Sequence, residues 1–187
     1  GIEHTAPACA LTLLEAPRVT PEALIVHLRP QLAAVVPANV ARIGIHLRHE
    51  HIEGASYHYT HGLAKHQGAC QRIAHGHRSR IAITLDGTRS AALEAEWAER
   101  FRDIYLVTGQ HLVADDGSRL RLAYTAPEGL FELALPKARC YVLGQDTDST
   151  VEEIAEHLAL QISASHPGRT VAVRAYEGVM KGALAAR

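Results

Sequence analysis

Histidine side chains are concentrated in one stretch of the chain, at spacings that could hold a metal ion. Eight of the 13 histidines lie between His46 and His77. His75 and His77 begin a segment with the pattern of a strand, where residues i and i+2 point to the same face. His61 lies near the end of the preceding such segment, and a hairpin would bring it opposite the pair. Three neutral imidazoles with a fourth position left open form a catalytic rather than a structural zinc site, so we predict Zn²⁺ at His61, His75 and His77.

Other interpretations of these histidines stay open. A single His-Gly-His sequence is a weak signal, and three exposed histidines in a polar loop region would look the same. The metal site is favoured because His61 lies on the partnered segment and a cysteine lies in the loop between them. Four further histidines compete as ligands, namely His49, His51, His58 and His66.

Cys70 lies five residues before His75 and is the candidate for a reactive group. A thiol beside a zinc dication loses its proton more readily, which would give a base or nucleophile near neutral pH. The alternative role, a small buried hydrophobic side chain, suits Cys140 in its apolar segment better. Cys9 lies near one end, in no such setting. Three cysteines, an odd number, do not indicate a disulfide framework, and a reducing compartment such as the cytoplasm is favoured.

Two hairpins and a helix are expected to position these side chains. Alternating apolar residues predict the strands, and Leu93, Trp97 and Phe101 at helical spacing predict the helix. The first expected hairpin joins Gly54–Ala64 to His75–Leu85 through the loop Lys65–Ala74. A turn at Asp86-Gly87 follows, and then a helix over Ser90–Arg102. The second expected hairpin joins Arg119–Tyr124 to Leu130–Leu135 around Pro127-Glu128-Gly129.

The two ends of the chain are similar to each other at an offset of 130 residues. For example, His27-Leu28 aligns with His157-Leu158 without gaps. Each copy shows an apolar strand, a helix that begins after a threonine N-cap, and a second strand. Duplication is favoured over convergence of two similar units. In the first copy the expected elements are the strands Ala10–Leu14 and Val40–Leu47 with a helix after Thr20, which Pro30 should either kink or leave with shortened hydrogen bonding. In the second copy they are the strands Cys140–Leu143 and Val171–Ala175 with a helix after Thr150.

Composition excludes several broad classes of protein. Hydrophobic residues make up 47% of the 187 residues, so a sizeable core is expected and disorder is not. The formal net charge of −1 argues against binding to nucleic acid or a membrane surface through bulk charge. The apolar runs are far shorter than the ~20 residues of a membrane span. Residues 1–8 lack the pattern of a secretory signal.

Taken together, these motifs resemble the 6-pyruvoyltetrahydropterin synthase and 6-carboxytetrahydropterin synthase family. The resemblance rests first on residues 57–63 (Tyr-His-Tyr-Thr-His-Gly-Leu), then Cys70, then His75-Gly76-His77. Residues 149–155 resemble the helix-start motif of the family, and Tyr176-Glu177-Gly178 resembles the segment with its pterin-anchoring glutamate. The resemblance covers about Gly54 to Ala183, and the motifs occur in the order of the family.

The resemblance implies an α+β T-fold, an antiparallel sheet with helices packed on one face that forms barrels when chains assemble into a homo-oligomer. It implies zinc at the three histidines, a proton-transfer thiolate at Cys70, and Glu177 at the pyrimidine edge of a pterin, where a carboxylate can accept two parallel N–H bonds. The implied activity is a zinc-dependent lyase or synthase that acts on 7,8-dihydroneopterin triphosphate. The 6-carboxytetrahydropterin branch, that of queuosine biosynthesis, is favoured over the 6-pyruvoyl branch.

Several residues depart from the family pattern. Arg78-Ser79 follow the His-Gly-His sequence, where the family commonly has Asn-Tyr. The family also has an Asp-His pair that usually assists the cysteine from a neighbouring subunit. Asp103 lies where that aspartate is expected, but Ile104 replaces the histidine, and His111 is the nearest candidate. We therefore name Asp103 and His111 as candidate catalytic partners of Cys70. The hairpin of residues 119–135 is interpreted as an insertion.

The repeat then divides the chain into two parts. Residues 1–50 are expected to be a structural, N-terminal half T-fold unit, and 51–187 a zinc-binding, pterin-synthase-like domain. The first copy has no counterpart of the three histidines, and Glu177 aligns with Leu47 unless Glu50 takes its place. Two alternatives to the leading function stay open. One is a different pterin enzyme on the same scaffold, aldolase- or reductase-like, and the other is a non-catalytic protein that binds zinc or a pterin.

Overall fold

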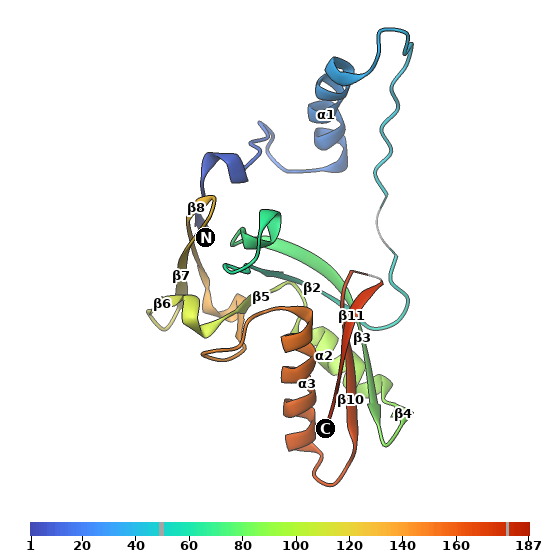
Figure 1. Ribbon diagram of the computed structural model, residues 1–187, viewed down its shortest axis with the longest axis vertical. Helices are drawn as coiled ribbons and strands as arrows, with labels where there is room; N and C mark the ends of the chain where they lie inside the picture. The colour runs from blue at the N-terminus through green and yellow to red at the C-terminus, as the bar shows by residue number, and fades with distance from the viewer. Residues whose placement is uncertain (49–50, 179) are drawn as a thin grey trace. The chain divides into compact units, whose positions relative to one another are not determined.

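The strands predicted around the histidines lie in the larger of two sheets (Figure 1). The structure, a computed structural model, describes residues 1–48, 51–178 and 180–187. The order of this sheet is β11-β10-β3-β2-β5-β9, with β4 on β3. Its strands are β2 (Ser56–His61), β3 (His75–Leu85), β4 (Thr88–Arg89), β5 (Ile104–Val107), β9 (Cys140–Val142), β10 (Val171–Glu177) and β11 (Lys181–Ala186).

Most strand pairs of this sheet are antiparallel, as predicted, but the pairs at the β9 edge are parallel. The pairs β2/β3, β3/β10 and β10/β11 are antiparallel, whereas β5 runs parallel to both β2 and β9. The first predicted hairpin is confirmed, with β2 shorter than expected. The strands of the second repeat copy are confirmed as β9 and β10.

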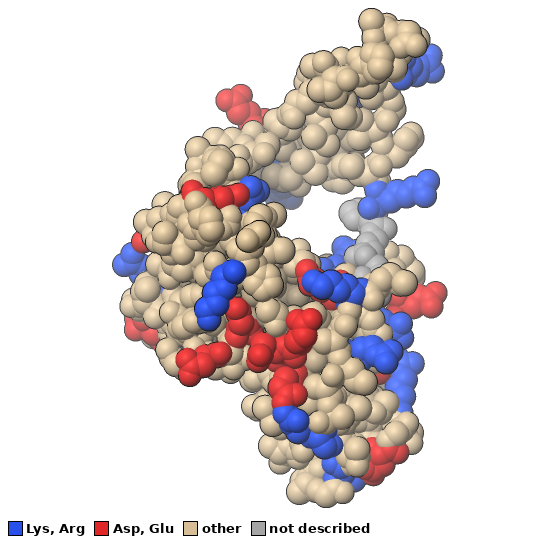
Figure 2. Space-filling view, in the orientation of Figure 1, with Lys and Arg blue, Asp and Glu red and all other residues tan. Residues whose placement is uncertain are grey.

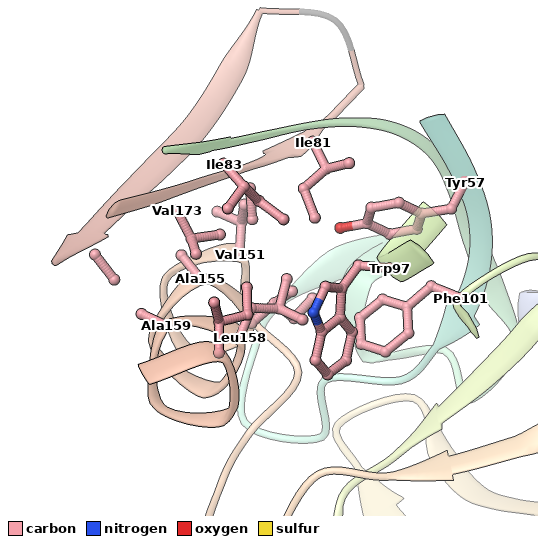
Figure 3. Close-up of a cluster of buried hydrophobic side chains, with 14 of the residues drawn as sticks. Tyr57, Ile81, Ile83, Trp97, Phe101, Val151, Ala155, Leu158, Ala159 and Val173 are labelled. Carbon is pink, nitrogen blue, oxygen red and sulfur yellow. The ribbon is translucent and has the colours of Figure 1, made fainter. Parts of the chain in front are cut away.

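Two helices cover one face of the sheet, α2 (Ala91–Arg100) and α3 (Val151–Ser165). The predicted cap of α3 is confirmed, because Thr150 accepts a hydrogen bond from Glu153 N. In α2 the side chain of Ser90 accepts from Leu93 N in the same way. Figure 3 shows Ile83 and Val173 of the sheet facing Leu158 of α3. Leu158 is fully buried, and burial of such a side chain contributes about 1.5–3 kcal/mol.

A second, four-stranded sheet has the order β1-β8-β7-β6. It confirms the second predicted hairpin, and its turn is at Pro127-Glu128. Its inner face has its own core, which includes Phe131 and Leu120 and also Ile73 from the loop between β2 and β3. The strands are β1 (Glu3–Thr5), β6 (Leu112–Asp115), β7 (Arg119–Ala126) and β8 (Gly129–Pro136), and short 3-10 helices are η1 (Ala8–Ala10), η2 (Gly68–Gln71), η3 (Gly109–His111) and η4 (Lys137–Arg139).

The first repeat copy differs from its prediction. Residues 11–51 form a separate compact unit, and residues 1–10 group with 52–187. The helix is confirmed as α1 (Pro21–Val35), capped by Thr20, and it continues past Pro30 to Val35. The strands predicted at Ala10–Leu14 and Val40–Leu47 are wrong, since neither segment is in a strand. A strand needs a neighbour for its backbone hydrogen bonds, and none of the described residues pairs with these segments. The interpretation as a half T-fold unit stays a prediction, and Glu50 lies outside the described residues.

Charged side chains of both signs are spread over the face seen in Figure 2. Among the described residues, none of the helices combines the length and the apolar character needed to span a bilayer.

Candidate metal centre and active site

The side chains of His61, His75 and His77 converge at one end of the helix-covered face. The register of the β2/β3 hairpin places His61 opposite His75, and Tyr59 opposite His77. The three ring centroids are 4.3, 5.1 and 5.2 Å apart. One possible ligand atom from each residue lies within 4.8 Å of the others, and among the described residues no other such group of histidine, cysteine or acidic side chains occurs. The structure thus has a three-histidine cluster that could hold a metal ion.

Backbone carbonyl groups orient two of these rings. His61 Nδ1 lies 2.9 Å from the Ser149 carbonyl oxygen and 3.0 Å from Ser149 Oγ, just before the first turn of α3. His75 Nδ1 lies 3.0 Å from the Arg72 carbonyl oxygen. A carbonyl only accepts, so we assign the proton of each ring to Nδ1, which leaves Nε2 with a free lone pair.

The Nε2 atoms of all three histidines are buried and, among the described residues, have no hydrogen-bond partner. A buried polar atom without a partner is costly. A metal ion bound by the three lone pairs would remove that cost, and imidazole nitrogens are ordinary zinc ligands. The residues present therefore fit a zinc ion.

Burial keeps these rings neutral. It lowers the pKa of His61 to about 2, with further lowering from the neighbouring His75 and His77. Burial likewise lowers the pKa of His75 and of His77. Neutral imidazole is the form that binds a metal, so the cluster does not have to lose protons near neutral pH.

Glu177, at the end of β10, lies beside the cluster. Its Oε1 is 3.4 Å from His77 Nε2, and its Oε2 is 2.5 Å from Lys181 Nζ. Burial alone would raise the pKa of Glu177, but Lys181 and His77 outweigh that effect and hold the pKa below its ordinary value. Lys181 was not predicted as part of the site, although a lysine four residues after a glutamate is a visible signal in the sequence. The carboxylate predicted to bind a pterin is thus charged and only partly buried.

Cys70 lies in η2, within the loop that connects the three histidines. Its backbone carbonyl accepts a hydrogen bond from Leu63 N at 3.0 Å, which fixes the backbone of Cys70 to the start of the loop. The thiol is partly buried and free, and it is near enough to Lys181 to contribute to the raised pKa of that side chain, behind the larger effect of Glu177. Cys140 has the inert setting expected of it, since burial raises the pKa of its thiol to about 11.

The two candidate partners of Cys70 lie in different places. Asp103 is 3.3 Å from His58 Nδ1, and His58 points to the face of β2 opposite to His61. This pairing of Asp103 with a histidine from the neighbouring strand was not expected. His111 contacts Tyr124, with ring centroids 4.6 Å apart and ring planes tilted by 46°. The hydroxyl of Tyr124 in turn donates to the carbonyl of Gln71, the residue after Cys70.

Three of the four competing histidines lie in the described part of the chain, and none of these three joins the cluster. His58 faces the other side of the sheet, and His51 is exposed. His66 is close enough to lower the pKa of His61 slightly but contributes no ligand atom. His49 lies outside the described residues.

Comparisons with known proteins show the family and the fold of the chain. The model of the 6-pyruvoyl tetrahydropterin synthase family matches residues 51–185. No curated protein sequence matches the chain significantly. Similar solved structures include a catalytic-residue mutant of the Plasmodium vivax 6-pyruvoyltetrahydropterin synthase (16% identity, TM-score 0.54) and the corresponding Plasmodium falciparum enzyme (13%, TM-score 0.50). Each match covers 71% of this chain and 91% of the other.

At these identities the solved structures show the fold alone, and they confirm the predicted α+β T-fold. The family model covers more than half of the chain. The chain therefore belongs to the 6-pyruvoyl tetrahydropterin synthase family.

Proposed function

We propose that this protein is a zinc-dependent lyase or synthase that converts 7,8-dihydroneopterin triphosphate to a 6-substituted tetrahydropterin. The observation that carries the proposal is the convergence of three buried Nε2 atoms, on His61, His75 and His77, none of them hydrogen-bonded. A zinc ion held there would act as a Lewis acid, polarising substrate oxygens and acidifying the neighbouring C–H bonds.

The remaining groups bind the substrate and move protons. The Glu177 carboxylate would accept two N–H bonds from the pyrimidine edge of the pterin, exchanging its contact with Lys181 for the ligand. Cys70, as a thiolate, would take a proton from a side-chain carbon of the substrate. Departure of triphosphate from the adjacent carbon then leaves a carbon–carbon double bond, so this elimination balances without an oxidant or reductant.

Asp103 and His111 remain the candidates for assisting Cys70. In this chain His111 lies close to the backbone beside Cys70, through Tyr124 and Gln71. Asp103 and His58 lie on the opposite face of the sheet, so they would serve a neighbouring subunit. We propose a homo-oligomer, because β11 and β9 each pair with only one strand of the described residues and so leave open sheet edges. We propose a reducing, cytoplasmic compartment because the three cysteines do not indicate a disulfide framework.

The test combines metal analysis with product analysis. Wild-type protein should contain zinc and consume 7,8-dihydroneopterin triphosphate, and we propose 6-carboxytetrahydropterin as the product, which mass spectrometry distinguishes from the 6-pyruvoyl compound. His75→Ala should lose both zinc and turnover, whereas the matched control His51→Ala should keep both. Cys70→Ala should keep zinc and lose turnover. Full turnover in Cys70→Ala would refute the role given to the thiol.

A different pterin enzyme on the same scaffold is the second candidate. It is favoured by the place of Asp103, which pairs with His58 rather than with a histidine beside Cys70. Consumption of another dihydropterin in preference to the triphosphate would support this candidate. Tight zinc binding without turnover of any dihydropterin would indicate a binding protein instead.

A further inference from the structure

Three consecutive residues of the loop that carries Cys70 are held by groups from elsewhere in the fold. We refer to residues 62–74, between β2 and β3, as the cysteine loop. The Tyr124 hydroxyl donates to the Gln71 carbonyl at 2.7 Å, and the Tyr105 hydroxyl donates to the Ile73 carbonyl at 2.6 Å. Tyr124 belongs to β7 of the second sheet, and Tyr105 belongs to β5.

The residue between them is held through its side chain. Arg72 donates from Nε and from Nη2 to the two carboxylate oxygens of Glu128, both at 3.1 Å. Such a two-bond contact fixes orientation as well as distance. Hydrogen bonds from Arg72 hold the pKa of Glu128 below its ordinary value, so the pair is charged at neutral pH. Glu128 lies in the turn of the β7–β8 hairpin.

The residues held by these contacts lie next to the three-histidine cluster and to the Cys70 thiol. The Arg72 carbonyl is the group that orients the His75 ring, at 3.0 Å from Nδ1. Cys70 is two residues earlier, and its own carbonyl is fixed to Leu63 N. The hairpin turn is thus connected to His75 through Arg72 alone. It is connected to Cys70 through Arg72 and Gln71.

The contacts are not needed to build the second sheet. Its strands pair with each other, and its core is apolar, with Phe131, Leu133 and Leu135 buried. By contrast, the Tyr124 hydroxyl and the Glu128 carboxylate both form hydrogen bonds to the cysteine loop. A hairpin that only covered the loop would not require polar groups directed at two successive loop residues, Gln71 and Arg72.

We infer that the β7–β8 hairpin is a positioning device, in which Tyr124 holds Gln71 and Glu128 holds Arg72, and that these two contacts set the Cys70 thiol and the His75 ring. This inference rests on the proposed function for the roles of Cys70 and His75. It assigns no contact with substrate to Glu128 or Tyr124, which act through the cysteine loop.

The variants Glu128→Ala and Arg72→Ala test the ion pair, and Tyr124→Phe removes one hydroxyl with little other change. We measure the dissociation constant for Co²⁺ through its absorption spectrum, the rate of alkylation of Cys70 by iodoacetamide followed by mass spectrometry, and kcat and KM for the dihydropterin substrate. Lys137→Gln is the matched control, because it breaks a different ion pair of the same sheet, with Asp115. Unfolding midpoints are recorded for all variants.

Loss of the ion pair should weaken Co²⁺ binding by about tenfold, as for other groups that orient metal ligands. It should also change the alkylation rate of Cys70 several-fold and lower kcat more than it raises KM. The exchange Arg72→Glu with Glu128→Arg should restore all three, and Lys137→Gln should resemble wild type. The inference is overturned if Glu128→Ala and Arg72→Ala match wild type in metal binding and alkylation, or if the exchange gives no rescue. Failure of the wild type itself to bind metal would refute the proposed function instead, and the alkylation rates would still test the hairpin.

Discussion

Gly62 is the residue at which a single methyl group should do most damage to the site. It follows His61 directly and is the first residue of the cysteine loop. An added Cβ would lie 2.1 Å from the Tyr124 hydroxyl oxygen and 2.6 Å from the Ile73 Cα. Real Cβ atoms essentially never approach other atoms within 3.0 Å, so Gly62→Ala must displace both neighbours.

The cost of Gly62→Ala follows from what each neighbour can do. The Tyr124 ring can move, but it would lose its hydrogen bond to the Gln71 carbonyl, which costs about 1 kcal/mol. Ile73 presents its backbone and a fully buried side chain, so its displacement is comparable to overpacking of a core, at about 1–3 kcal/mol. We therefore expect the free energy of unfolding to fall by about 2–4 kcal/mol.

The assay is urea denaturation of the metal-free protein, followed by titration with Co²⁺. Gly62→Ala should show a lower midpoint at an unchanged slope and weaker metal binding. Gly44→Ala is the control, since its Cβ would meet only His46, at 3.6 Å. The reasoning is refuted if Gly62→Ala is as stable as wild type and binds Co²⁺ equally well.

Two further predictions concern the core and its pH dependence. Leu158→Ala should lower the free energy of unfolding by about 2–5 kcal/mol, because Leu158 is fully buried between α3 and the sheet, and a loss below about 1 kcal/mol would contradict the packing described. Burial alone would raise the pKa of Glu94, but hydrogen bonds from Arg89 and from Ile83 N outweigh it and lower the pKa. The stabilisation from Glu94 should therefore be present in full above its unfolded pKa of about 4.3 and be lost as the pH falls through its lower folded pKa. Unfolding midpoints of wild type and Glu94→Gln should converge at acid pH, and a constant difference would contradict this assignment.

The histidine cluster could be predicted because it depends on local geometry. Alternation along a strand places His75 and His77 on one face, and a hairpin of adjacent strands brings His61 opposite. The register observed, with His61 opposite His75, confirms this prediction. The helices α2 and α3 were predictable for the same reason, since caps and apolar spacing lie within one segment of sequence.

Features that depend on distant segments could not be predicted. The ion pair between Arg72 and Glu128 joins residues 56 positions apart, and no local pattern indicates it. The same is true of Asp103 and His58, which meet because β5 lies beside β2 in parallel. Register between non-adjacent strands is set by packing of the whole sheet.

In the first repeat copy, the sequence pattern predicted two strands that the structure does not contain. Thr20 and the apolar spacing after it predicted α1 correctly. The segments that flank α1 have the same apolar pattern as β9 and β10. An apolar pattern does not by itself supply the neighbouring strand that a strand needs for its hydrogen bonds. The second copy has neighbours in β5 and β3, whereas none of the described residues pairs with residues 11–14 or 40–47.

Zinc titration of the metal-free protein by calorimetry tests the central claim most directly. The cluster of His61, His75 and His77 predicts about one tightly bound zinc per chain. That binding should be absent in His75→Ala and unchanged in His51→Ala. A wild-type chain that binds no zinc, or a His75→Ala variant that binds it as tightly as wild type, would contradict the account.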